Sequence, residues 1–422
     1  MQMSDWVVHK FGGSCLRIPG DLDRIIECLE DVSGRPAIIV SALWGVTDRL
    51  MRAIREPWQW SGLVNDLRRQ HHRFAPGVEE DEAFMQCLNG LASDLLSLSR
   101  QPRDIDLQAS ILSSGERLSC ITVASALARR GLETTHVQAD DLGITIGDDD
   151  MTIDIEASVR ALDTTLLAAG IPVISGWLGR TIDGRTRVLD RGGSDLTAAA
   201  LASILDAQGL ILWKDVPGIL SVSPRWGIEA TTIPYLGHEE ALALARAGGI
   251  ILHASCIEPL MGTGIPCWIR SLHSKESQTM IGPSLEHEDR GVIAISCVPG
   301  MIHYTINSPA RRIPSVLESL LRILRDEAVK VWKLNAAEGR LSMFLPASLS
   351  RIIEDVLESH GCTWEHSLTA TLISLIGRDI EVDMEGCIHH HREEHALHLL
   401  FVEEDLHGLM ERLSTKFQLR NG

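Results

Sequence analysis

Two glycine-rich turns, Lys-Phe-Gly-Gly-Ser at residues 10–14 and Arg-Gly-Gly-Ser-Asp at residues 191–195, decide how the chain is expected to fold. The first turn ends an apolar N-terminal stretch, and the second opens a long alanine-rich helical pattern. Glycine lets a backbone approach a charged ligand closely, and a helix N-terminus attracts anions. We therefore expect the two turns to converge, so that Lys10 and Asp195 flank one phosphate at a phosphoryl-transfer site.

Around these turns, short apolar stretches alternate with helical patterns. This alternation predicts an α/β sandwich with a mainly parallel central sheet, whose ligands bind at the carboxyl ends of the strands. The expected strands are 6–10, 37–41, 171–175 and 209–213, and the expected helices are 21–29, about 57–103 and 107–130.

Near residues 282–289 the chain becomes a polar, acidic connector, and two small α+β units are expected after it. We therefore expect a first domain over 1–283 and a second region over 290–422, divided into units of about 290–361 and 362–422. The first unit is predicted to hold strands 292–297, 329–333 and 340–345 and helices 313–326 and 349–359. The second is predicted to hold strands 369–376 and 396–402 and helices 380–388 and 404–417.

The composition excludes several kinds of partner. A net charge of −18 argues against nucleic acid or an anionic membrane as the main partner. Nine cysteines without a CxxC spacing suggest reduced thiols. The N-terminus shows no secretory pattern, and no apolar run approaches the roughly 20 residues that span a bilayer. We expect a cytoplasmic protein with no membrane partner.

Other side chains near the turns allow two interpretations each. Glu116, in an apolar helical stretch, would receive a substrate ammonium or pair with Arg117 or another arginine. Thr47 would donate to a substrate carboxylate or cap the following helix. Arg191 offers a planar fork for a substrate carboxylate. Ser14 would add a hydroxyl to the site or act as a helix cap.

Two further motifs lie outside the glycine turns. The sequence Trp-Lys-Asp-Val-Pro-Gly at 213–218, followed by Arg225, suits nucleotide binding, although a structural turn is the alternative. The histidine run 389–391, with His395, favours a solvated hairpin over a zinc site because the ligand spacing is poor.

Together these motifs resemble the aspartokinase family, the amino-acid kinases that phosphorylate the β-carboxylate of L-aspartate with ATP. The resemblance rests on the stretches 10–14, 40–48, 114–116, 176–180, 191–195 and 213–218, in consistent order up to about residue 283. It implies an amino-acid-kinase-type three-layer sandwich followed by two ACT-like (βαββαβ) units. It also implies ATP and Mg²⁺ as cofactors, a possible amino-acid effector at the ACT-like units and a homodimer.

The resemblance assigns roles by position, without a metal ligand. Lys10 and Asp195 would be catalytic. The substrate would contact Thr47, Glu116, Trp177, Arg191 and Ser194. The nucleotide would contact Lys10, Gly12, Gly13, Ser14, Gly192, Gly193, Lys214, Asp215, Leu220 and Arg225.

Three departures from the family pattern fall on the nucleotide side. Lys214 replaces a threonine, Leu220 replaces a tyrosine, and Ile250 replaces a lysine. An aspartate kinase is the leading hypothesis. A kinase for another acidic amino acid and a catalytically weak, amino-acid-sensing homologue are the alternatives.

Overall fold

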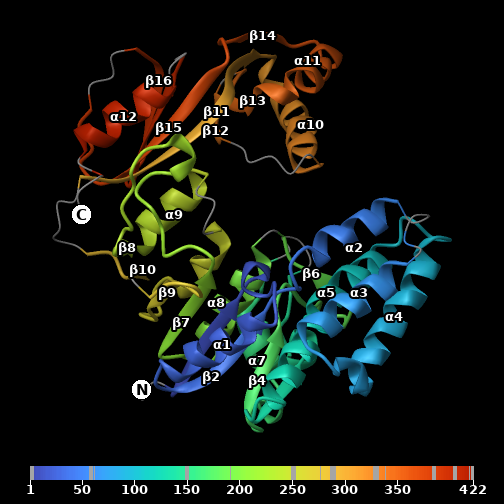
Figure 1. Cartoon of the computed structure of the whole chain (residues 1–422). Coiled ribbons are helices and arrows are strands. Elements are labelled where there is room, and N and C mark those ends of the chain that lie inside the picture. The colour runs from blue at the N-terminus through green and yellow to red at the C-terminus, as the bar shows by residue number, and fades with distance from the viewer. Residues whose placement is uncertain are drawn as a thin grey trace. The chain divides into compact units, whose positions relative to one another are not determined.

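The chain divides into two compact units in the computed structural model (Figure 1). The first unit holds residues 1–220 and 232–286, and the second holds residues 221–231 and 287–422. The structure describes residues 4–56, 60, 62–147, 152–190, 192–248, 253–275, 277–285, 291–326, 332–337, 339–382, 386–402, 406–417 and 419.

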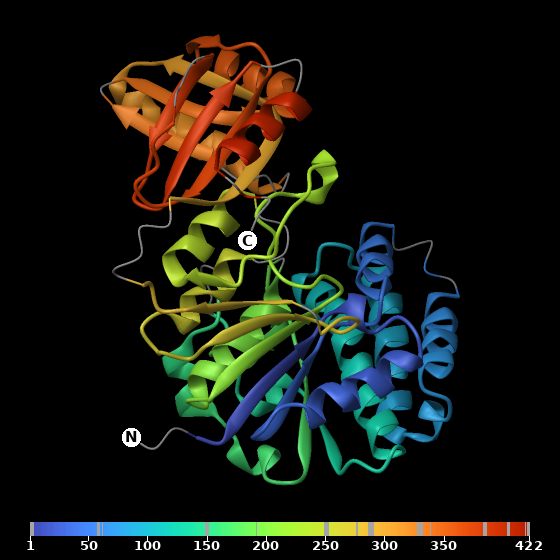
Figure 2. The ribbon, with the colours of Figure 1, turned by 60° about the vertical axis from the view of Figure 1, so that its left-hand side comes forward.

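An eight-stranded sheet forms the centre of the first unit, in the order β3-β4-β2-β1-β7-β9-β10-β8. All neighbouring strands in it run parallel except β9 and β10. Figure 2 shows β1, in blue, beside the green strand β7 in the middle of this sheet. The strands are β1 (Trp6–Phe11), β2 (Arg35–Val40), β3 (Thr134–Val137), β4 (Ile171–Ser175), β7 (Gly209–Lys214), β8 (Tyr235–Gly237), β9 (Cys267–Ser271) and β10 (Gln278–Gly282).

Helices cover both faces of this sheet, so the unit has three layers. One face packs against α1 and α5, where Phe11 and Trp213 join a large apolar core with Leu22 and Ile25. The alanine-rich helix α8 lies against β1, β2 and β7 on the other face, since its small side chains allow close packing. The helices are α1 (Gly20–Glu30), α2 (Val46–Arg55), α3 (Leu63–Phe74), α4 (Glu82–Leu98), α5 (Ile105–Ala128), α6 (Ala139–Leu142), α7 (Ile155–Ala161), α8 (Gly193–Ile204) and α9 (His238–Arg246).

A short hairpin, β5 (Leu178–Arg180) with β6 (Thr186–Val188), lies outside the main sheet. It connects the end of β4 to the start of α8, and both of these ends carry residues that the sequence places at the site. Among the described helices, none has the length and hydropathy that crossing a membrane requires.

The second unit is built on an antiparallel sheet in the order β12-β13-β11-β15-β17-β16, with β14 also paired to β11. Its first part has the order βαββαβ. Strand β11 is long enough to pair with both parts, since it meets β13 and β14 near one end and β15 near the other. The elements are β11 (Val292–Asn307), α10 (Ile313–Asp326), β12 (Trp332–Ala337), β13 (Arg340–Pro346), α11 (Ser350–Ser359), β14 (Thr363–His366), β15 (Ala370–Gly377), β16 (Cys387–Arg392), β17 (Ala396–Phe401) and α12 (Leu406–Lys416).

The predicted fold class is confirmed, but one predicted element is wrong and several strands were not predicted. The helix expected over 380–388 is wrong, because Cys387 to Arg392 forms β16, which pairs antiparallel with β17. The histidine run therefore lies in a β-hairpin, as the sequence favoured. Cross-strand pairing with β17 outweighs the weak helical pattern of this stretch.

Candidate active site

Two lysines from neighbouring parallel strands point to the same face of the central sheet. Lys10 lies near the end of β1 and is in register with Leu212 of β7. Because side chains alternate along a strand, Lys214, two residues after Leu212, projects from the same face as Lys10. That face is the one covered by α8.

Both lysines contact the carboxylate of Asp195, in the first turn of α8. Lys10 Nζ lies 2.6 Å from Asp195 Oδ1 in an ion pair, and Lys214 Nζ donates a hydrogen bond of 2.6 Å to Oδ2. Lys10 and Asp195 are each 5% exposed. The two glycine-rich turns thus converge as the sequence predicted, whereas the contact of Lys214 was not foreseen.

Lys10, Lys214 and Asp195 form a cluster that we call the Lys10 group. The carboxylate that the two lysines share sets the net charge of this group. Burial opposes ionisation of Asp195, but the two ammonium groups outweigh it and hold its pKa well below the ordinary value. Burial lowers the pKa of Lys10, and the nearby Lys214 adds to this effect while Asp195 opposes it. Burial also acts against Lys214, yet its pKa is raised because Asp195 stabilises the ammonium. Two cations on one anion leave a surplus positive charge that favours an anionic ligand.

The turn before α8 depends on glycine. Gly192, the N-cap of α8, has φ 84°, a conformation that other residues rarely adopt, and a Cβ there would lie 2.7 Å from His253 Cβ. Gly193 and Ser194 follow in the first turn, and Ser194 is 8% exposed. A Cβ on Gly176, just after β4, would lie 2.7 Å from Ser194 Cβ. The end of β4 and the start of α8 are therefore in direct contact.

The first glycine turn lies beside Lys10. Gly12 precedes the short helical turn Gly13–Cys15, which contains Ser14. A Cβ on Gly12 would come within 3.3 Å of Lys10 Nζ, and one on Gly13 within 3.0 Å of the carbonyl oxygen of Ala42. The backbone of this turn is thus open towards the ammonium group.

Glu116 is a buried carboxylate with one unsatisfied oxygen. Its Oε1 accepts a hydrogen bond of 3.2 Å from the amide of Ala42, and its Oε2 has no hydrogen-bond partner. Burial raises the pKa of Glu116 to about 8. Gly115 makes this approach possible, since its missing side chain leaves space for Ala42 and Leu50. An unsatisfied buried oxygen of this kind suits a cationic ligand.

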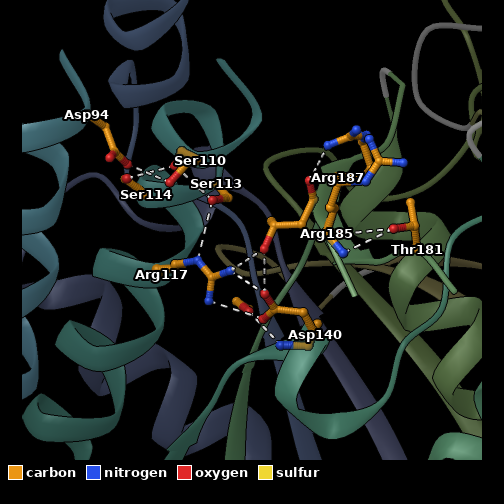
Figure 3. A network of polar contacts seen from close by, with 12 residues as sticks. Asp94, Ser110, Ser113, Ser114, Arg117, Asp140, Thr181, Arg185 and Arg187 are labelled. Atoms are coloured by element: carbon orange, nitrogen blue, oxygen red, sulfur yellow. Dashed lines mark hydrogen bonds and ion pairs between the residues drawn. The ribbon is translucent and has the colours of Figure 1, made fainter. Parts of the chain in front are cut away.

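The alternative pairing of Glu116 with Arg117 is excluded by the contacts of Arg117. Its guanidinium bridges to Asp140 of α6 and lies 3.4 Å from Thr186 Oγ1 of β6 (Figure 3). Thr186 in turn donates to Asp140 Oδ2 at 3.0 Å. Nearby, Arg187 of β6 forms an ion pair of 2.6 Å with Asp106 of α5.

This network ties the β5–β6 hairpin to the helix that carries Glu116. Sequence reasoning missed it because Asp140 and Thr186 are 23 and 69 residues from Arg117. The sequence signal for this network was weak: Arg117 directly follows Glu116, which pointed to a charged contact near that helix without identifying its partners.

Trp177 lies between β4 and β5 in a strained backbone conformation, with φ 67°. Such a conformation costs a non-glycine residue roughly 1–3 kcal/mol and needs support from its surroundings. Thr197 Oγ1 of α8 accepts a hydrogen bond from the Trp177 amide at 3.1 Å, and the indole donates to the carbonyl of Asp190 at 3.1 Å. Thr197 is a positioning residue that the sequence did not single out.

Three other residues that the sequence assigned to the site, Thr47, Asp215 and Leu220, lie on separate segments of the first unit. Thr47 is partly buried in the first turn of α2, after the left-handed Gly45. Asp215 follows Lys214 and forms an ion pair of 3.2 Å with Arg17. Leu220 bridges to Thr232 in the first unit.

Arg225 belongs to the second unit, and its guanidinium donates to the carbonyl of Cys297 there. Its expected nucleotide contact stays a prediction. Arg191 and Ile250 lie outside the described residues.

The residues near Lys10 do not fit a protein-held Mg²⁺ ion. Both oxygens of Asp195 face ammonium groups, and Asp215 is paired with Arg17. Within the described part of the chain, no group of three histidine, cysteine or acidic side chains has metal-binding geometry.

Comparisons with known proteins identify relatives of the chain. The model of the amino acid kinase family matches residues 5–271. Aspartokinase of Chlamydia muridarum is 27% identical over 74% of this chain and 72% of its own. The bifunctional aspartokinase/homoserine dehydrogenase 1 of Arabidopsis thaliana is 27% identical over 67% of this chain, which spans only 33% of that longer protein.

Solved structures show the same fold over nearly the whole chain. The structure of E. coli aspartokinase III in complex with lysine and aspartate has a TM-score of 0.79 at 22% identity and covers 98% of this chain and 100% of its own. That of the same enzyme with aspartate and ADP has a TM-score of 0.78 at 22% identity, over 97% and 99% of the two chains. The family match covers more than half of the chain, including both glycine turns and all three charged residues of the Lys10 group, and this chain belongs to the amino acid kinase family.

Proposed function

We propose that the chain is an aspartate kinase, which transfers the γ-phosphoryl group of ATP to the β-carboxylate of L-aspartate and forms 4-phospho-L-aspartate. One observation carries the proposal: Lys10 and Lys214 share the buried carboxylate of Asp195 at 2.6 Å each. Phosphoryl transfer needs little covalent help from the protein and depends on positioning and charge neutralisation. A buried pair of ammonium groups supplies that charge where water is excluded.

The acceptor needs no general base. An aspartate carboxylate has an ordinary pKa of about 3.9 and is ionised at neutral pH. One of its oxygens forms a bond to the γ-phosphorus while the bond from phosphorus to the β–γ bridging oxygen breaks, and ADP leaves with that electron pair. The predicted role of Lys10 is to neutralise the charge on the transferring group, and that of Asp195 is to hold both amines in place.

The amino-acid end of the acceptor would bind near Glu116. Its unsatisfied Oε2 is suited to the α-ammonium group, which would replace the missing counter-charge in the apolar surroundings. Thr47, Trp177, Ser194 and Arg191 are predicted to contact the same substrate. The resemblance rather than a contact supports these four assignments.

The nucleotide side is predicted to use the amides of Gly12 and Gly13, together with Lys214. Lys214 stands where the family has threonine, and the family's lysine is Ile250 here. We infer that Lys214 supplies the second phosphate-binding charge from β7. The expected Mg²⁺ would bind together with the ATP phosphates, since the described residues do not form a set of protein ligands for it.

The named relatives support this choice of substrates. The E. coli enzyme of similar fold was solved with aspartate and ADP, and also with lysine. By analogy, the reaction would be the first step of the aspartate-derived amino-acid pathway. An amino-acid effector at the ACT-like units and a homodimer remain predictions.

A coupled assay tests the proposal. Purified protein is incubated with Mg²⁺-ATP and each of a small panel of acidic amino acids, and both ADP and the acyl phosphate, trapped as its hydroxamate, are measured. We expect stoichiometric ADP and hydroxamate with L-aspartate. A different preferred acceptor would favour a kinase for another acidic amino acid. Binding of ATP by calorimetry without product would favour the amino-acid-sensing homologue.

A further inference from the structure

The strands that carry the active-site lysines present a different surface on their opposite face. Phe11 of β1, Trp213 of β7 and Arg270 of β9 lie side by side in register across three neighbouring strands. Phe11 and Trp213 stack with ring centroids 5.9 Å apart and nearly parallel planes. Because side chains alternate, Trp213 faces α1 while Lys214, the next residue, faces α8.

A cavity of about 380 Å³ lies over this row. Its walls come from α1 and the following Asp31, from Trp213, and from residues 270–275, 277 and 278 at and between the ends of β9 and β10. In a parallel sheet, ligands bind at the carboxyl ends of strands, and this cavity lies at the carboxyl ends of β7 and β9. Its volume is in the range of small-molecule sites. None of the residues predicted for aspartate or ATP lines it.

Arg270 is a partly buried cation in this cavity, and the nearby Asp31 acts on it electrostatically without forming an ion pair. Its Nε donates to Gln278 Oε1 at 2.7 Å, and within the described segments no carboxylate lies at ion-pair distance from it. Burial lowers the pKa of Arg270. Its neighbour His9 does not compete as a cation, because burial and Arg270 together lower the pKa of His9 to about 3. The guanidinium therefore retains free donors for an anion.

The other charges of the cavity are mostly paired. Arg24 forms an ion pair of 3.0 Å with Asp21, and Lys275 pairs with Asp31. Glu27 of α1 is exposed and forms no ion pair with a described residue, while the nearby Lys275 interacts with it electrostatically. Among the described charged residues that line the cavity, Arg270 and Glu27 are thus the cation and the anion that form no ion pair.

We propose that this cavity binds a free α-amino acid, with its carboxylate on Arg270 and its ammonium group on Glu27. A zwitterion can place its carboxylate near Arg270 and its ammonium group near Glu27, whereas Glu27 would repel a simple anion. Ser271 and Ser277 also line this cavity and add polar groups to it. This site is separate from the Lys10 group and from the ACT-like units, and it does not depend on the proposed kinase activity.

Titration calorimetry of the full chain tests the site with each common amino acid except aspartate, which the active site is proposed to bind. At least one amino acid is expected to bind at concentrations below about 10 mM. Arg270→Met and Glu27→Gln should each raise its Kd at least about tenfold, since each removes a charge-assisted contact. Arg100→Met, which changes an exposed arginine in the turn after α4, is the matched control and should leave the Kd unchanged.

Two results would overturn the proposal. One is that no amino acid of the panel binds. The other is that binding is seen but neither variant weakens it, which would place the ligand elsewhere, including the second unit. Glu27 lies on the surface of α1, so Glu27→Gln remains decisive even where Arg270→Met fails to fold.

Discussion

Lys214 Nζ lies 2.6 Å from Asp195 Oδ2, on the opposite carboxylate oxygen from Lys10. The residue that breaks the family's sequence pattern is therefore part of the charged centre of the site. A lysine from β7 can reach this point because residues 212 and 214 share a sheet face with Lys10.

Replacing Lys214 by threonine, the residue usual in the family, is expected to impair the enzyme. The change removes one of two buried cations, and kcat/KM for ATP should fall by about 10²-fold, as when one electrostatic donor is lost from an active site. Steady-state kinetics with varied ATP measure this. Lys416→Thr, an exposed lysine on α12, is the control, and equal rates for both variants would refute the role of Lys214.

Replacing Asp195 by asparagine is expected to destabilise the first unit. The change leaves two buried ammonium groups without a counter-charge, and breaking a buried ion pair costs about 3 kcal/mol. Urea unfolding followed by circular dichroism should show a lower midpoint. Adding Lys214→Thr to this variant should recover part of the loss, because one uncompensated charge is removed. No recovery would argue against a shared charge.

Aspartate binding is expected to release a proton through Glu116. The pKa of Glu116 is raised to about 8, so the carboxyl is mostly protonated at pH 7 in the free protein. An arriving ammonium group favours the ionised form, so aspartate affinity should rise as the pH increases from 6 to about 8. Calorimetry in buffers of different ionisation enthalpy measures the released proton. In Glu116→Gln the release should vanish and the KM for aspartate should rise.

The raised pKa of Glu116 also predicts how the stability of Glu116→Gln, relative to the wild type, changes with pH. A folded-state pKa above the unfolded value of 4.5 means that the folded chain holds the proton more tightly. The stabilisation from this proton is complete below pH 4.5 and is lost as the pH rises to about 8. The glutamine variant lacks this loss, so its Tm relative to the wild type should increase between pH 6 and pH 8.5. A constant difference in Tm would contradict the shifted pKa.

Arg117→Met is expected to weaken the binding of aspartate, the phosphoryl acceptor, and to leave the binding of ATP little changed. Without its contacts to Asp140 and Thr186, the β5–β6 hairpin loses a tie to α5, and Trp177 precedes this hairpin directly. The KM for aspartate should rise about tenfold, since small misplacements are costly in active sites, with the KM for ATP little changed. Arg130→Met, which breaks the exposed pair with Asp23, is the control. An equal rise in both KM values would contradict this role.

Sequence patterns located the elements with strong local signals. The continuous apolar stretches became β1, β2, β4 and β7, and the helix predicted over 313–326 has those same bounds. The error at 380–388 arose where a strand depends on its partner β17 rather than on its own periodicity. Strands β3, β5, β6, β8 and β14, of three or four residues each, were not predicted because such short stretches carry little pattern. The five-residue strands β9 and β10 were also missed.

Part of the candidate site could be predicted because local sequence motifs mark it. Lys10 and Asp195 stand in glycine turns that mark a close approach of the backbone to a ligand. The contact of Lys214 depends on the register between β1 and β7, and that of Arg117 depends on Asp140 from another helix. Pairings of this kind are set by tertiary packing, which one sequence does not reveal.

Single-turnover transfer from γ-labelled ATP to aspartate, by rapid quench, tests the central claim most directly. With wild-type protein, label should appear in 4-phospho-L-aspartate. In Lys10→Ala the transfer rate should fall by at least about 10²-fold, while the aspartate concentration at half-maximal rate changes little. A transfer rate in Lys10→Ala close to that of the wild type would contradict the account.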